Sequence, residues 1–402
     1  MFENIIGQTN TISSLKSDLT THNFPPAVLF HGPDYCGKLS TALEIARVQN
    51  CKAQWDWNCT CHSCEQHRLL IHPNLLLLGT RDFTTEISAA ADVLLRTGKI
   101  SARYFFVRAV RKQLKGFDPV LWEGDAARIK GYQQTIQDIE EEILNFLPEK
   151  SIQEEKAAGN SLTRILKLSA KLSGSSKSEN IPINQVRNAI FWAHHSAVGG
   201  KKIIIIDNAD KMLDASRNAL LKTLEEPPGD LNIILLTSNK GAIIRTILSR
   251  VRPYLFRQRT TEEASEILTK IFREQNPEYR SIREYFLAWK ELNPALLKNL
   301  AHKFIQFVLD SAPVPDICEE MKELFKAVSP KEALLSFFEE LYLFFRQTLL
   351  NVQNRDTAKS KGFRHIEKWS GILRDSLYQV EQLNLSPKNT LEYIYLKFRN
   401  NL

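Results

Sequence analysis

A run of four isoleucines that ends in an aspartate, residues 203–207, constrains the fold of this chain more than any other feature. An unbroken run of β-branched apolar residues is typical of a strand that is buried on both faces of a parallel sheet. The carboxylate of Asp207 would then lie at the edge of a nucleotide pocket. An alternative is that Asp207 and Asp210 have only structural roles, as a solvated strand end and a helix cap. The pattern predicts an α/β fold.

A phosphate-loop sequence follows the apolar run of residues 26–31 and opens a predicted helix that ends near residue 50. The spacing G-x-x-x-x-G-K predicts backbone N–H groups and a helix N-terminus that face an anion. However, Leu39 stands where a Ser or Thr hydroxyl would touch Mg²⁺, and Tyr35 replaces a small residue. The loop therefore either keeps the fold without tight nucleotide binding or binds ATP or ADP weakly. The candidate nucleotide-binding residues are Gly32, Gly37, Lys38 and Asp207.

Four of the six cysteines lie within residues 51–64, and they are Cys51, Cys59, Cys61 and Cys64. The chain has no apolar run near the roughly 20 residues that span a bilayer, and its N-terminus lacks a signal pattern. We therefore expect a cytoplasmic protein with reduced thiols and no membrane contact, in which such a cluster predicts a structural Cys₄ zinc site. If Cys59 or Cys61 does not ligate, His62 or His67 is the expected substitute. Free thiols with a redox role are the alternative.

The segment of residues 81–180 matches no motif and is expected to be a mostly helical insertion. No acidic residue interrupts the basic stretch 96–115, and Arg108, Arg111 and Lys115 fall on one helical face. This face is expected to be solvated, or else to contact DNA or a partner. Residues 172–179 have the composition of a flexible linker.

The C-terminal part of the chain is expected to be helical, because strand signals disappear after residue 257. Thr260 and Glu263 form a predicted capping box, and residues 334–350 and 390–398 are amphipathic. At 402 residues the chain should contain two to four domains. Its net charge of +7 is compatible with work near nucleic acid, but it is weak evidence over this length.

Taken in order, these motifs resemble the bacterial DNA polymerase III clamp-loader subunits of the AAA+ class, most closely the delta-prime subunits. The resemblance covers roughly residues 1–80 and 181–256, and the run 218–228 (NALLKTLEEPP) carries it most strongly. The matching stretches are residues 2–8, the loop 32–38, the four cysteines, residues 72–74, 183–187, 203–228 and 246–251.

The resemblance implies roles for single residues. Arg250 matches an arginine that reaches in trans into the ATP site of a neighbouring subunit, where its charge stabilises the transferring phosphoryl group. A surface arginine that ends a helix is the alternative. Residues 237–239 look like the segment that senses the γ-phosphate. Active ATPase subunits of the group would need a glutamate where Asn208 stands and a second sensing arginine near residues 293–295, for which Lys298 is a doubtful substitute.

The resemblance also implies an architecture and an assembly. The expected parts are an AAA+ α/β domain over residues 1–258, a helical lid over 259–301 and an oligomerisation collar over 302–402. Such a chain would be a non-hydrolysing stator that joins gamma/tau and delta subunits in a hetero-pentamer, which loads the sliding clamp on primed DNA. Alternatives are an ATP-hydrolysing subunit of the gamma/tau type and a binding module that has left replication.

Overall fold

The computed structural model divides the chain into two compact units, residues 1–283 and 284–402. It describes residues 1–150, 155–175, 180–275, 278–290, 294–310, 330–353, 360–383 and 386–402. Within these ranges no helix is both long enough and apolar enough to cross a membrane. The predicted lid and collar boundaries at residues 259 and 302 stay predictions.

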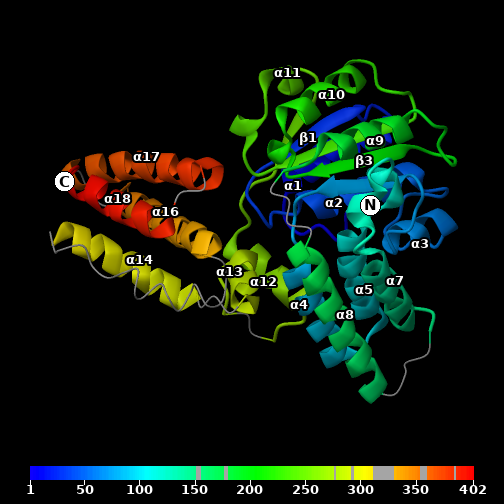
Figure 1. The fold of residues 1–402 in the computed structure, drawn as a ribbon, viewed down its shortest axis with the longest axis horizontal. Helices are drawn as coiled ribbons and strands as arrows, with labels where there is room; N and C mark the ends of the chain where they lie inside the picture. Colours follow the sequence, from blue (N-terminus) through cyan, green and yellow to red (C-terminus); the bar gives the residue numbers. More distant parts are fainter. Residues whose placement is uncertain are drawn as a thin grey trace. The chain divides into compact units, whose positions relative to one another are not determined.

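A five-stranded parallel sheet forms the centre of the first unit, with the strand order β2-β3-β4-β1-β5 (Figure 1). The strands are β1 (Ala27–His31), β2 (Leu75–Gly79), β3 (Lys202–Asp207), β4 (Leu231–Thr237) and β5 (Arg252–Leu255). Every residue of β3 is buried, which confirms the interpretation of the isoleucine run. Because the strands are parallel, their carboxyl ends meet at one edge of the sheet, where Asp207 lies.

Helices cover the sheet on both faces, which confirms the predicted α/β class (Figure 1). The helices beside the sheet are α1 (Thr9–Thr20), α2 (Lys38–Asn50), α3 (His62–Arg68), α9 (Ile183–Ala193), α10 (Asp214–Glu225) and α11 (Arg245–Leu248). One apolar core joins α9, α10 and α11 to alternate residues of β1, β2, β3 and β4. The first unit continues with α12 (Thr261–Lys270), whose N-terminus carries the predicted capping box of Thr260 and Glu263, and α13 (Ile282–Trp289) begins at its end.

The segment between β2 and α9 is mostly helical where it is described, as predicted, with one isolated β-bridge at Ile181. Its helices are α4 (Thr84–Thr97), α5 (Ile100–Lys115), α6 (Ala126–Ile129), α7 (Gln133–Ile143) and α8 (Glu155–Ser175), with short 3₁₀ turns at Pro119–Trp122 and Leu144–Phe146. The predicted linker is wrong over residues 172–175, because α8 continues through them and buries Leu172 completely. The rest of that predicted linker, residues 176–179, lies outside the described residues.

The second unit is all helical where it is described, as expected for the C-terminal part. Its helices are α14 (Pro294–Leu309), α16 (Pro330–Gln353), α17 (Ser360–Leu383) and α18 (Pro387–Arg399). Aromatic side chains fill its core; for example, the ring of Trp369 stacks on Phe398 at 5.0 Å between centroids, and Phe345 lies beside both. Two predictions fall on residues that are not described: Cys318, expected to be an ordinary buried cysteine, and residue 293, in the stretch where a second sensing arginine was sought.

Candidate functional site

The phosphate loop connects β1 to α2 and has the backbone conformation that its two glycines permit. Gly37 has a φ of 100°, and a Cβ there would lie 2.6 Å from Nη2 of Arg259. At Gly32, with a φ of 148°, a Cβ would lie 2.0 Å from the carbonyl oxygen of Phe256. Gly32 therefore requires glycine on conformational and steric grounds, and Gly37 requires it on conformational grounds. Tyr35 also has a positive φ, of 58°, which is uncommon for a bulky residue.

The ammonium group of Lys38 is hydrogen-bonded by the loop itself. Lys38 is 4% exposed, and its Nζ donates to the carbonyl oxygens of Gly32 at 2.5 Å and of Pro33 at 2.6 Å. Arg259 lies against the loop and donates to the carbonyl oxygen of Tyr35. In a phosphate loop that holds nucleotide, the lysine reaches the outer phosphates instead. Here the ammonium group of Lys38 already has two backbone acceptors.

Asp207 ends β3 and is only 2% exposed. Nε of Arg81 lies 2.5 Å from its Oδ2, and Nη2 of Arg81 donates to its Oδ1 at 3.0 Å. Next to Asp207, the side-chain amide of Asn208 donates to Oγ1 of Thr80 at 3.2 Å. The predicted pocket aspartate is therefore paired with an arginine. The sequence analysis missed Arg81, although a basic residue just past the end of an apolar run, residues 75–78, was a signal that could have drawn attention to it.

The segment after β4 is connected to the same edge of the sheet. Oγ1 of Thr237 donates to Oδ1 of Asp210 at 2.5 Å, and the backbone N–H of Asn239 donates to Oγ1 of Thr237 at 2.9 Å. Asp210 thus binds the segment that resembles a γ-phosphate sensor. This contact supports a structural role for Asp210.

Arg250 follows α11, and an acidic residue of α10 holds it. Its Nε donates to Oε1 of Glu225 at 2.9 Å, and its Nη1 donates to the carbonyl oxygen of Thr246 at 2.7 Å. The side chains of Arg250 and Glu225 remain 30% and 49% exposed. The guanidinium is therefore positioned at the surface of the chain by partners that solvent can reach.

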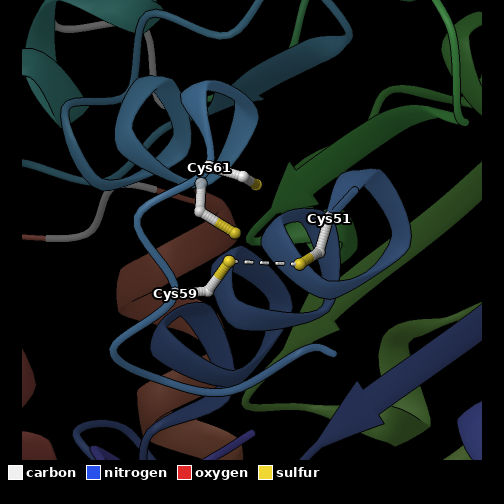
Figure 2. Close-up of side chains that lie close together, drawn as sticks. Cys51, Cys59 and Cys61 are labelled. Carbon is white, nitrogen blue, oxygen red and sulfur yellow. Dashed lines mark hydrogen bonds between the residues drawn. The ribbon is translucent and has the colours of Figure 1, made fainter. Parts of the chain in front are cut away.

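The four predicted cysteine ligands converge, although they come from three different local structures. Cys51 follows the last turn of α2, Cys59 lies in the loop after it, and Cys61 and Cys64 stand at the start of α3 and within it (Figure 2). Their Sγ atoms all lie within 4.8 Å of one another, and those of Cys51 and Cys59 are 3.7 Å apart. Zn–S bonds of about 2.3 Å in a tetrahedron require S–S distances of about 3.8 Å. This donor set fits a metal ion such as zinc.

The clustered thiols differ in acidity, since burial raises the pKa of Cys64. Burial would raise the pKa of Cys61, but backbone N–H groups of Lys52 and Cys64 outweigh it and lower that pKa to about 6. Neither His62 nor His67 belongs to the metal-binding group found among the described residues. Instead, His67 is buried and its ring stacks on His72 at 4.1 Å between centroids.

A buried ion pair joins the cysteine cluster to the phosphate-loop helix. Arg47 and Glu44 of α2 are each 2% exposed, and Nη2 of Arg47 lies 2.7 Å from Oε1 of Glu44. Arg47 also donates from Nη1 to Sγ of Cys64 at 3.1 Å and from Nη2 to the carbonyl oxygen of Trp55 at 3.0 Å. Burial alone would lower the pKa of Arg47, but hydrogen bonding to Glu44 raises it. A charged guanidinium therefore faces the sulfur of a candidate zinc ligand.

Arg108 and Arg111, on the basic face of α5, make internal contacts, so the expectation that this face is simply solvated is wrong, while contact with DNA or a partner stays a prediction. Nη1 of Arg108 donates to the carbonyl oxygens of His67 and Arg68 at 3.3 and 3.0 Å, and Arg111 donates to that of Leu69 at 2.8 Å. These carbonyls end α3, where cations are favoured by the unpaired backbone acceptors and the helix dipole. The face is basic because it caps a helix of the cysteine module.

Replacing Arg108 with alanine is therefore expected to destabilise the protein by about 1–3 kcal/mol, because carbonyl groups at the end of α3 lose their donors. Urea denaturation would measure the change, with Lys99→Ala in the exposed turn before α5 as a control within about 0.5 kcal/mol of the original protein. An unchanged stability combined with weaker DNA binding would favour the DNA-facing interpretation.

Comparison with known proteins identifies relatives of this chain. A family model described as "DNA polymerase III, delta subunit" matches residues 7–103 and 136–260. The delta-prime subunit of Pseudomonas aeruginosa is 37% identical over 71 residues, 17% of this chain and 22% of the relative. That of Buchnera aphidicola subsp. Baizongia pistaciae is 28% identical over 219 residues, 53% of this chain and 56% of the relative. The gamma subunit of Buchnera aphidicola subsp. Acyrthosiphon pisum is 32% identical over 81 residues, 20% of this chain and 22% of the relative. In each case, this chain spans less than two thirds of the relative's length.

Proposed function

The chain belongs to the delta-prime family of DNA polymerase III subunits, which is related to the gamma/tau subunits, and we propose that it serves in a clamp loader without hydrolysing ATP itself. Its partners would be gamma/tau and delta subunits, and the assembly would place the sliding clamp on primed DNA. In this proposal residues 259–301 are a lid and residues 302–402 are a collar that joins the subunits.

The observation that carries the non-hydrolysing role is the identity of two pocket residues: Leu39 offers no hydroxyl to Mg²⁺, and Asn208 offers no carboxylate to polarise water. In addition, the carboxylate of Asp207 is already paired with Arg81. Gly32, Gly37, Lys38 and Asp207 would thus be the remains of a nucleotide site. The isolated chain is expected to show no Mg²⁺-dependent ATP turnover, and turnover abolished by Lys38→Ala would instead favour a gamma/tau-type ATPase.

We assign the chemical contribution of the chain to Arg250. A guanidinium is always charged and matches the geometry of phosphate oxygens, which suits it to stabilise a transferring phosphoryl group on an adjacent subunit. Its present partner Glu225 is 49% exposed, so the ion pair is weak enough to be exchanged for a phosphate. The exchange would bring Arg250 into a neighbour's ATP site without refolding α11.

Replacing Arg250 with alanine is expected to lower the DNA-stimulated ATPase of the reconstituted clamp loader. An arginine finger increases the rate of phosphoryl transfer about 10³-fold or more. The ATP site that receives Arg250 should therefore lose nearly all its activity, while the other ATP sites of the complex continue to hydrolyse ATP. The isolated variant should keep its stability within about 1 kcal/mol, because a surface ion pair contributes little.

The matched control is Arg252→Ala, which removes another surface ion pair two residues away, with Asp18, and should leave the ATPase of the complex unchanged. An equal rate for the Arg250 and Arg252 variants would remove the assignment of Arg250, and failure of the chain to assemble with gamma/tau would remove the proposed function.

A further inference from the structure

The register of the sheet brings the ends of β2 and β3 together. Gly79 pairs with Asp207, and a Cβ at residue 79 would lie 2.4 Å from the carbonyl oxygen of Asp207. Gly79 therefore allows the chain to pass close over the end of β3. Two residues later, Nη2 of Arg81 donates to Oδ1 of the Asp207 carboxylate, and its Nε lies 2.5 Å from Oδ2 in an ion-pair contact without hydrogen-bond geometry.

A carboxylate as buried as Asp207 requires a cation, because an unpaired charge away from water is costly. In phosphate-loop enzymes that cation is Mg²⁺, which an aspartate at this position helps to hold and which bridges the phosphates. Here the required charge comes from the chain. The guanidinium stays charged: burial alone would lower the pKa of Arg81, but the carboxylates of Asp207 and Asp34 raise it.

We propose that Arg81 occupies the divalent-cation position at Asp207, so that this chain carries a built-in cation where a nucleotide-hydrolysing relative would bind a metal ion. This inference deepens the proposed non-hydrolysing role. It rests on the proposed function in one respect, which is that the pocket is treated as a former nucleotide site. A metal at Asp207 would lack one of its usual ligands, because Leu39 has no hydroxyl group. The proposal explains why an aspartate is nevertheless present at residue 207. The carboxylate of Asp207 has a structural role, because it binds Arg81 and thereby holds the segment that follows β2.

The groups around Arg81 determine which ligands a metal ion would meet if the arginine side chain were removed. Asp207 and Asp34 both act electrostatically on Arg81, and Oγ1 of Thr80 lies beside the side chain of Asn208. Oxygen ligands such as the carboxylate of Asp207 and the hydroxyl of Thr80 are those that Mg²⁺ and Mn²⁺ prefer. Removal of the guanidinium should therefore turn a closed ion pair into a divalent-cation site.

The test uses the full chain in metal-free buffer without a chelator, so that the cysteine cluster keeps its metal. Mn²⁺ is the probe, and its binding is followed by electron paramagnetic resonance of free Mn²⁺ and by the thermal midpoint. Arg81→Ser is expected to bind about one equivalent and to gain several degrees of thermal stability from Mn²⁺, since a ligand that binds only the folded state stabilises it. The original protein and Arg81→Lys, which keeps a positive charge, should show neither effect.

The double variant Arg81→Ser, Asp207→Asn is the matched control, since it lacks both charges and should lose the Mn²⁺ response. If Arg81→Ser does not fold in metal-free buffer, Mn²⁺ present during refolding is expected to restore the folded form. The proposal is overturned if the original protein already binds Mn²⁺ through Asp207, or if Arg81→Ser shows no Mn²⁺-dependent binding, stabilisation or refolding. ATP turnover by the original protein would instead refute the proposed function, whatever the Mn²⁺ result.

Discussion

Purified protein is expected to contain about one zinc ion per chain, and Cys61→Ser is expected to lose it together with the local fold of residues 51–68. The four Sγ atoms already lie at distances that a tetrahedral metal requires. Without a metal, thiolates so close together would repel one another, and none of residues 51–61 between α2 and α3 is buried. Structural zinc contributes about 10–16 kcal/mol in isolated zinc-finger peptides, and part of that would be lost here.

Metal analysis of the purified variants, together with hydrogen exchange over α3, would measure this effect. Cys36→Ala is the matched control: Cys36 is buried in the phosphate loop and is not one of the clustered cysteines, so its replacement should leave the zinc content unchanged. A Cys61→Ser protein that retains a full equivalent of zinc and unchanged exchange would show that Cys61 is not a ligand.

Replacing Arg47 with methionine is expected to destabilise the protein by about 3–5 kcal/mol, since it leaves the carboxylate of Glu44 buried without its partner. Methionine fills much of the same volume, so loss of charge rather than a cavity dominates the effect. The variant should also bind zinc more weakly, because the N–H donor to Sγ of Cys64 and its positive charge are removed.

A double variant, Glu44→Leu with Arg47→Met, separates these contributions. It removes both buried charges and should recover much of the lost stability, but not the zinc affinity, because Cys64 still lacks its donor. Denaturant unfolding and competition with a chromogenic zinc chelator would measure the two quantities. If the single variant costs less than about 1 kcal/mol, the ion pair does not have the structural role assigned to it.

Several features could be predicted because each depends on residues close together in the sequence. The isoleucine run indicated a buried parallel strand, and the spacing of Gly32, Gly37 and Lys38 indicated a strand, a loop and a helix in that order. The cysteine spacing within residues 51–64 indicated a metal cluster, and the pair Thr260 and Glu263 indicated a helix start. Local periodicity and short-range spacing decide such elements.

The sequence by itself determined the α/β class, the phosphate-loop scaffold, the cysteine cluster and the family, because these follow from short-range patterns. Only the tertiary structure decided that Arg81 pairs with Asp207, 126 positions later, and that Arg108 of the basic stretch caps α3. A cation in a sequence gives no sign of its partner. That partner is chosen by strand order and helix packing, which bring distant segments together and bury charges that must then be neutralised.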